Sequence, residues 1–149
     1  MSGSFHQIPG SLVQIAAGSF AAWGVNASQD IFFFDGNGFR QVPGGLAQIA
    51  AGGGSLGTPD NVWGINGEFF LRFDPNTQLF GLIPVPGAAL VQIVVSKPGG
   101  SVRVWGINAS TEIFRFNPNT QLFEQIPGSL VQIADGWGIN ASRTYLKIA

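Results

Sequence analysis

Nine residues, IPGSLVQIA at positions 8–16, recur without change at positions 126–134. Two diverged copies, VPGGLAQIA at 42–50 and VPGAALVQI at 85–93, keep the Pro-Gly pair and the Gln-Ile pair. A Trp-Gly-x-Asn motif and then an aromatic run follow each copy in the same order. The chain therefore contains four repeats, of roughly 40 residues in the complete copies, which is a spacing typical of stacked repeat architectures.

Each repeat predicts four short strands. The first carries Leu-x-Gln-Ile-Ala, the second Trp-Gly-x-Asn, the third the aromatic run, and the fourth Phe-x-x-Ile/Val before Pro-Gly. No segment shows the 3.6-residue period of a helix over enough length. A four-stranded antiparallel unit that is apolar on both faces must stack on its neighbours, so we predict an all-β fold, a β-propeller with four blades per chain. A β-sandwich is the rival, but it does not explain four copies of one motif in one order.

Two kinds of turn are predicted between the strands. The dipeptides Asn66-Gly67 and Asp135-Gly136 favour type I′ hairpins, because both residue types tolerate a positive φ. DPNT at 74–77 and NPNT at 117–120 suit type I turns, in which an Asp or Asn side chain accepts backbone hydrogen bonds and Pro fixes φ.

The two ends of the sequence match different parts of one repeat. FHQIPG at 5–10 corresponds to FEQIPG at 123–128, so residues 4–8 are predicted to form a fourth strand. We expect this N-terminal strand to complete the C-terminal blade and remove its open edge. The chain is then one domain, 1–149, with repeats at 11–43, 44–84, 87–126 and 129–149 plus 4–8. The alternative is that the same strand completes a blade in a second chain, which predicts a swapped homo-oligomeric ring of eight blades.

The composition excludes several classes of protein. The 149 residues include 22 Gly and 9 Pro but only 10% charged residues, with a formal net charge of −1. A nucleic-acid partner is not expected, because it requires a basic patch. Membrane insertion is not expected either, since no apolar run approaches ~20 residues. No signal peptide is visible, so the localisation stays unknown, either cytoplasmic or reached by non-classical release.

The repeated motifs resemble tectonin-type repeats, a β-propeller family found in lectin-like proteins of slime moulds, fungi, fish eggs and bacteria. The resemblance rests on LVQIA, WGINAS, IFRF and FEQIPG in the third and fourth repeats and on their diverged copies elsewhere, so it covers nearly the whole chain. It implies a propeller that binds carbohydrate, in some members O-methylated sugars or bacterial surface glycans.

The four tryptophans, with the asparagine three residues after each, are the candidate ligand-binding residues. An aromatic ring can stack on the apolar C–H face of a pyranose while polar groups fix the hydroxyls. The alternative is that each tryptophan fills the gap between stacked blades and each asparagine satisfies a turn. The candidates are Trp23, Asn26, Trp63, Asn66, Trp105, Asn108, Trp137 and Asn140.

Other motifs indicate neither catalysis nor a cofactor. The NAS tripeptides at 26–28, 108–110 and 140–142 match the glycosylation sequon, but their shared repeat position favours Asx turns. Residues 52–57 fit G-x-G-x-x-G but lead into another strand, so a hairpin loop is expected there. His6 is the only histidine and there is no cysteine, which excludes a catalytic triad and a His or Cys metal cluster. We expect no enzyme activity, no cofactor and no metal.

The resemblance therefore predicts a non-catalytic lectin that recognises surface glycans through several weak, repeated sites, whose number raises avidity. The alternative is a structural or protein-interaction propeller scaffold, natural or engineered, without a sugar site. The expected partners are glycans, with a homo-oligomer in the alternative arrangement of the chain ends.

Overall fold

The computed structural model describes residues 3–18, 21–53, 61–85, 89–97 and 101–147, and its described part is all-β. Three antiparallel sheets have four strands each, paired in chain order, and a fourth sheet has three. We call these sheets blades 1 to 4. Their strands are β1 (Gln14–Ala17), β2 (Ala22–Val25), β3 (Asp30–Phe34) and β4 (Phe39–Gly45); β5 (Gln48–Gly52), β6 (Asn61–Asn66), β7 (Phe69–Asp74) and β8 (Leu79–Leu82); β9 (Leu90–Ser96), β10 (Arg103–Asn108), β11 (Ile113–Asn117) and β12 (Leu122–Ile126); and β13 (Gln132–Ala134), β14 (Trp137–Ile139) and β15 (Tyr145–Lys147).

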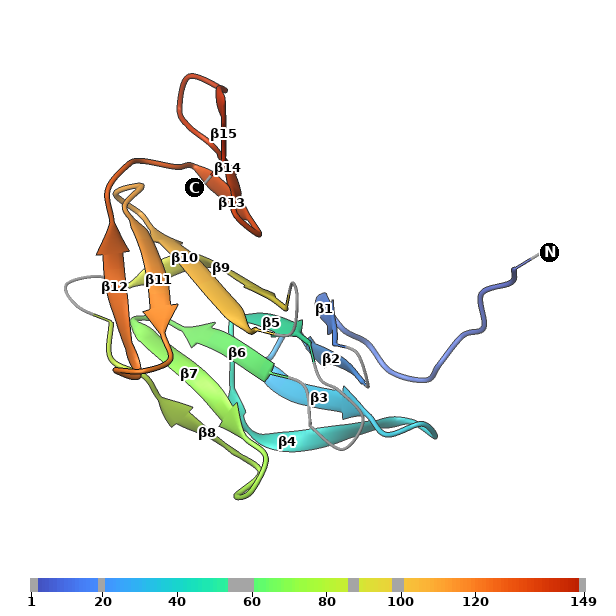
Figure 1. Cartoon of the computed structure of the whole chain (residues 1–149). Helices are drawn as coiled ribbons and strands as arrows, with labels where there is room; N and C mark the ends of the chain where they lie inside the picture. The colour runs from blue at the N-terminus through green and yellow to red at the C-terminus, as the bar shows by residue number, and fades with distance from the viewer. Residues whose placement is uncertain (1–2, 19–20, 54–60, 86–88, 98–100, 148–149) are drawn as a thin grey trace.

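The blades follow one another in chain order, as in a β-propeller. The first strands of successive blades contact each other, β1 with β5, β5 with β9 and β9 with β13, while the fourth strands lie at the periphery (Figure 1). The strand assignment made from the repeats is therefore confirmed in the first three blades. None of the described segments is a helix long and apolar enough to cross a membrane.

The N-terminal segment does not complete the last blade of the same chain. Residues 3–10 form no strand and are exposed, and β15 pairs with β14 alone among the described residues. Figure 1 shows the reason: the N-terminal segment extends away from blade 1, whereas β13–β15 stand at the other end of the row of blades. The expectation that residues 4–8 close a four-bladed ring within one chain is not met in this structure.

The hydrophobic core lies between blades rather than within them. Trp63 of blade 2 packs edge-on against Phe116 and Phe123 of blade 3, with ring centroids 4.8 and 6.1 Å apart. Such edge-to-face contacts between aromatic rings add to the burial of apolar surface. Trp23 of blade 1 makes the same pair of contacts with blade 2, at 4.9 and 6.5 Å, to the rings of Phe73 and Phe80.

In blades 1 to 3, a glutamine of the first strand links its blade to the next. The side-chain Oε1 of Gln48 accepts a hydrogen bond from the backbone N–H of Ile93 at 3.1 Å, and its Nε2 donates to the carbonyl of Val91 at 3.2 Å. The Oε1 atoms of Gln14 and Gln92 accept equivalent bonds across the other two junctions. The inner strands thus satisfy backbone donors that their own sheets leave unpaired.

The turns are partly as predicted. Neither expected type I′ turn forms, because that type needs a positive φ at both central residues. Gly67 (φ 57°) and Gly136 (φ 70°) are each the single central residue with a positive φ in their hairpins. The Asx acceptors are confirmed: Oδ1 of Asp74 accepts from the N–H of Asn76 at 2.8 Å, and the NPNT turn repeats this bond. Of the glycine-rich stretch 52–57, residues 54–57 lie outside the described residues.

Candidate functional site

Two of the four candidate asparagines use both ends of the side-chain amide to close the turn between the second and third strands of their blades. Oδ1 of Asn26 accepts from the backbone N–H of Asp30 at 2.9 Å, and its Nδ2 donates to the Asp30 carboxylate at 2.9 Å. Asn108 makes both bonds to Glu112 in blade 3, at 2.9 and 2.6 Å. These side-chain amides already have partners on both sides.

The other two candidate asparagines are also engaged. Oδ1 of Asn140 accepts from the N–H of Thr144 at 2.9 Å, while Nδ2 of Asn66 donates across the junction to the carbonyl of Gly45 at 3.0 Å. The asparagines of the three NAS tripeptides therefore act as backbone acceptors in turns, and Asn26 also makes the Asx-turn bond, accepting from the N–H of Ser28 at 3.0 Å. Sugar binding by the four asparagines stays a prediction, and their turn bonds leave few free donors or acceptors for it.

The four candidate tryptophans fall into two groups. Trp23, Trp63 and Trp105 are buried between blades, whereas Trp137 is 53% exposed. The packing role that the sequence left open is thus observed for the three buried indoles. A stacking surface for a sugar requires an open ring face, so the predicted binding role has room only at Trp137 and at the margins of the buried rings.

A cation lies over the tryptophan ring in three blades, and an aromatic ring takes its place in blade 1. Cations placed in this way attract the negative face of the indole. The three cations are Arg72 over Trp63 at 5.2 Å, Arg115 over Trp105 at 5.6 Å and Lys147 over Trp137 at 5.5 Å, measured to the ring centroid. In blade 1, Phe33 lies 5.4 Å from Trp23, with the two ring planes 31° apart.

This substitution leaves an uncharged groove between blades 1 and 2. Its volume is about 620 Å³, and its walls come from β2, β3 and β4 on one side and from the β7–β8 turn on the other. Aromatic surface from Trp23, Phe33 and Phe73 lines it, and none of the described lining residues is charged. Its polar side chains are Gln41, Thr77 and Gln78. An apolar cleft with a few polar groups is the usual form of a small-molecule site.

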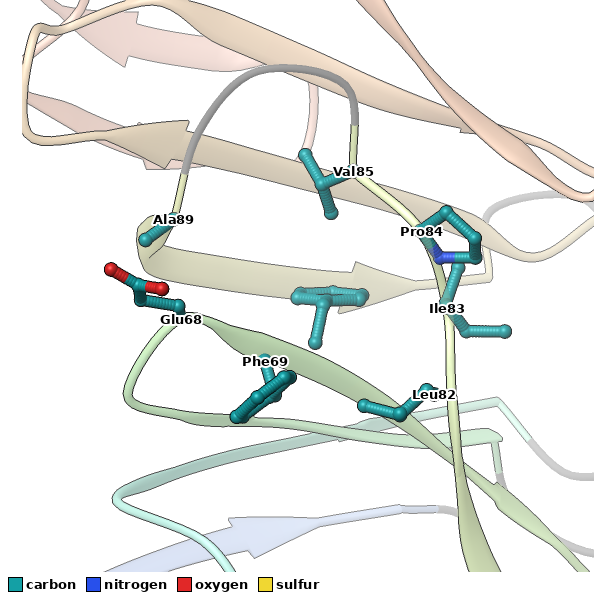
Figure 2. Close-up of a pocket in the computed structure, with 8 residues that line it drawn as sticks. Glu68, Phe69, Leu82, Ile83, Pro84, Val85 and Ala89 are labelled. Atoms are coloured by element: carbon teal, nitrogen blue, oxygen red, sulfur yellow. The ribbon is translucent and has the colours of Figure 1, made fainter.

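A second pocket, of about 490 Å³, lies between blades 2 and 3 (Figure 2). Glu68 and Ala89 lie at one end of it, and Leu82, Ile83 and Pro84 at the other. The Glu68 carboxylate is the one charged group among the described lining residues. This pocket offers fewer side-chain hydrogen-bonding groups than the groove between blades 1 and 2.

A third pocket, of about 460 Å³, lies at the junction of blades 3 and 4 beside Trp105. Arg103 and Arg115 line it together with Asn117 and Asn119. Its basic lining distinguishes it from the uncharged groove. The indole Nε1 of Trp105 has no hydrogen-bond partner within the described structure.

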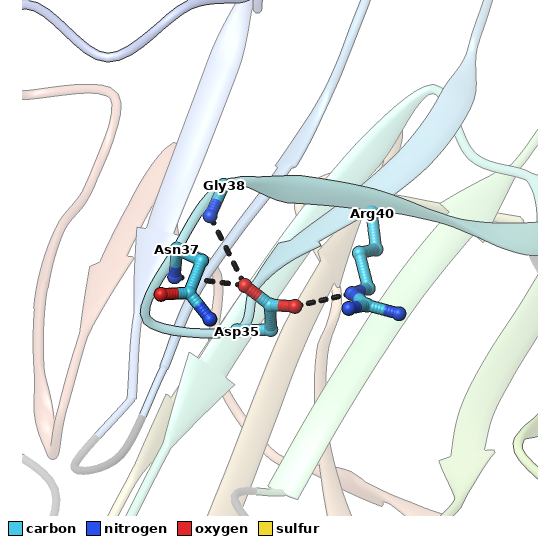
Figure 3. A network of polar contacts seen from close by, with 4 residues as sticks. All are labelled: Asp35, Asn37, Gly38 and Arg40. Carbon is cyan, nitrogen blue, oxygen red and sulfur yellow. Dashed lines mark hydrogen bonds and ion pairs between the residues drawn. The ribbon is translucent and has the colours of Figure 1, made fainter.

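The β3–β4 turn holds a carboxylate with several hydrogen-bond partners (Figure 3). Oδ1 of Asp35 accepts from the backbone N–H groups of Asn37 and Gly38 at 2.9 and 3.0 Å, and Arg40 pairs with the other oxygen. These backbone hydrogen bonds, followed by the bond from Arg40, lower the pKa of Asp35 to about 2. Within the described residues no group of three or more His, Asp or Glu gathers at one point, and the expectation of no enzyme activity stays a prediction.

A family model described as the Tectonin domain matches residues 1–142. The chain therefore belongs to the tectonin family, and the resemblance seen in its repeats is confirmed. The class of protein is thus a repeat protein of the β-propeller type.

Two solved structures similar to this chain are the extracellular domain of BT4673 from B. thetaiotaomicron, described once as a one-component and once as a hybrid two-component system. The TM-scores are 0.52 and 0.54 at 13% identity, over 98% of this chain. The chain spans about a fifth of the length of those chains, 21% and 20%. At this identity the likeness concerns the fold alone. No curated protein matches the chain.

Proposed function

We propose that this protein is a lectin without catalytic activity, and that the groove between blades 1 and 2 is its principal sugar site. Membership of the tectonin family supports the class of function. The observation that carries the location is Phe33, which stands where the other blades place a cation over the tryptophan. A neutral aromatic face is what the C–H face of a pyranose needs.

The groove favours neutral sugars with exposed apolar groups. Among the residues that the structure describes there, no charge selects for or against an anionic sugar, and the amide and hydroxyl groups of Gln41, Thr77 and Gln78 can bind ring hydroxyls. The aromatic wall also suits O-methyl groups, because each methyl removes a hydroxyl that the apolar surface could not pair. We therefore expect neutral glycans, including O-methylated ones, to bind weakly at one principal site rather than at four equal ones.

The test compares the wild-type protein with Phe33→Arg on a glycan array that includes O-methylated sugars. This change installs the side chain that blades 2 and 3 carry at the same position, so the fold has a precedent for it. We expect a loss of at least tenfold in glycan affinity, because the guanidinium covers Trp23 and brings a charge into the groove, with the melting temperature nearly unchanged.

The matched control is Arg115→Lys, which copies the cation of blade 4 at a position outside the groove and is expected to retain binding. Absence of binding by the wild-type protein to every glycan would favour the scaffold alternative. Glycan binding that Phe33→Arg leaves unchanged would move the site elsewhere on the molecule.

A further inference from the structure

The two end blades expose the positions that the inner blades bury. Ile15 of blade 1 is 63% exposed, whereas the equivalent Ile49 of blade 2 is 3% exposed. Trp137 of blade 4 is 53% exposed, and the equivalent Trp63 is 1% exposed. Tyr145 is also exposed, although the residue in its place in each of the other blades is buried. We call the side of blade 1 that carries Ile15 its head face, and the side of blade 4 that carries Trp137 and Tyr145 its tail face. These two faces match the two halves of the interface that successive blades form inside the chain.

The aromatic contacts at the two ends are complementary. Phe34 and Phe39 form a tilted pair 5.5 Å apart in blade 1, equivalent to the pair Phe116 and Phe123 that covers Trp63. Within the described structure the pair Phe34 and Phe39 covers no tryptophan of a preceding blade. In the same part of the chain, no aromatic pair of a following blade covers Trp137. Each end thus has the groups that the other end needs.

The hydrogen bonds made by the glutamines also leave complementary groups at the two end blades. The glutamines of blades 1 to 3 each accept from the isoleucine N–H of the next blade. Gln132, the fourth in the series, is exposed and makes no such side-chain bond among the described residues. The N–H of Ile15, the first isoleucine in the series, receives no such bond within the same part of the chain.

The N-terminal segment fits the open edge of β15. In blade 3, β12 pairs with β11 so that Glu124 faces Arg115. Lys147 takes the place of Arg115 in blade 4, because each lies opposite the tryptophan of its blade. His6 takes the place of Glu124 in the repeat, so residues 6–8 would face 147, 146 and 145 in turn. An exposed strand edge of this kind is a template for pairing with another chain.

We propose that two copies of this chain join head to tail, and that residues 4–8 of each copy form the fourth strand of blade 4 in the other. The head face of blade 1 then packs on the tail face of blade 4 at two identical junctions. A head-to-tail interface gives a closed ring when the rotation closes. Two copies bring eight blades, the upper end of the usual range of four to eight, whereas three copies would exceed it.

The first experiment measures the solution mass of the full chain by light scattering. We expect twice the chain mass of 15.7 kDa for the wild-type protein. Ile15→Arg and Trp137→Arg place a charge in the head and tail faces, and both are expected to reduce the mass to one chain. Because both residues are exposed in the single chain, the blades themselves should remain folded.

The matched control is Val131→Arg. Val131 is exposed at 48%, and its counterparts Val13 and Val91 in other repeats are exposed too; among the described residues only the backbone carbonyl of Val91 takes part in a junction, so the side chain at this position lies outside the repeated interface. The control should keep the two-chain mass, as should Phe33→Arg, since the assembly does not depend on sugar binding. A single-chain mass for the wild type, or a series of masses above two chains, would overturn the proposal.

The second experiment tests the strand exchange by disulfide cross-linking, which the absence of native cysteine makes clean. Chains with His6→Cys and chains with Lys147→Cys are refolded together and oxidised. We expect a cross-linked product containing one chain of each kind, and little product from either variant alone. A double variant that gives only a cross-link within one chain would show instead that the chain closes on itself, and would overturn the exchange.

Discussion

The glycine that follows each tryptophan faces a leucine of its own blade. A Cβ at Gly64 would overlap the δ-methyl groups of Leu46, which is fully buried, and the same conflict recurs at the equivalent glycine of every blade. The close approach of this leucine, rather than an unusual φ, therefore explains why the Trp-Gly pair is repeated four times.

Gly64→Ala is accordingly expected to lower the free energy of unfolding by about 1–3 kcal/mol, the usual cost of overpacking a core. The measurement is chemical unfolding in urea. Gly81→Ala is the matched control, because a Cβ there meets no atom within 4 Å and the backbone does not have a positive φ. Equal unfolding free energies for the two variants would contradict the packing explanation.

Asp35 makes the stability contributed by the β3–β4 turn depend on pH. Its pKa is lowered from 3.8 to about 2 in the folded protein, so the folded state prefers the ionised form. The stabilising contribution of the carboxylate is therefore complete above about pH 4 and is lost as the pH falls from 3.8 towards 2.

Asp35→Asn keeps an oxygen acceptor in the turn, as Asn117 does in blade 3, but removes the charge. We expect the difference in melting temperature between wild type and variant to be constant from pH 7 to about pH 4. The difference should then shrink as the pH falls from 3.8 and approach zero only well below pH 2, where both side chains are neutral. A difference that persists unchanged to pH 2 would show that the charge has no part in it.

The candidate groove could have been found in the sequence, but the role of the tryptophans could not. When the aromatic runs of the repeats are aligned, Phe33 occupies the position that holds Arg72 and Arg115 in the second and third repeats, so the first repeat differs at this position. Whether Trp63 binds a ligand or fills a junction depends on what covers it, and the phenylalanines that do so come from another repeat about 50–60 residues later. Local pattern carries no information on that contact.

The strands of the first three blades were predictable because each is bounded by its own turn residues and repeats in one order. The N-terminal segment shows where this reasoning stops. Residues 5–10 and 123–128 share almost the same sequence, yet the second copy contributes to β12 and the first forms no strand. The difference lies in the neighbour: β11 is joined to β12 by a short turn, whereas residues 4–8 have no strand beside them in the single chain. Whether a segment forms a strand therefore depends on the presence of a neighbouring strand as well as on its own sequence.

Across the whole molecule, the stability of the row of blades rests on its junctions. Each blade contacts its sequence neighbours, as in other repeat proteins whose stability is a sum of unit and interface contributions. Gln48 makes a polar contact across the central junction, because its side-chain Oε1 accepts a hydrogen bond from the backbone N–H of the buried Ile93.

Gln48→Ala is therefore expected to destabilise the protein by about 1–3 kcal/mol, the cost of leaving a buried backbone N–H without its partner. Gln125→Ala is the control, since Gln125 is exposed and its side chain bonds within its own blade, to Glu112 at 3.3 Å. Both unfolding curves must be measured at one protein concentration, because a two-chain ring makes the midpoint depend on concentration. If Gln48→Ala unfolds like Gln125→Ala, the glutamine links do not hold the blades together, and the hydrogen-bond part of the head-to-tail junction between copies loses its basis as well.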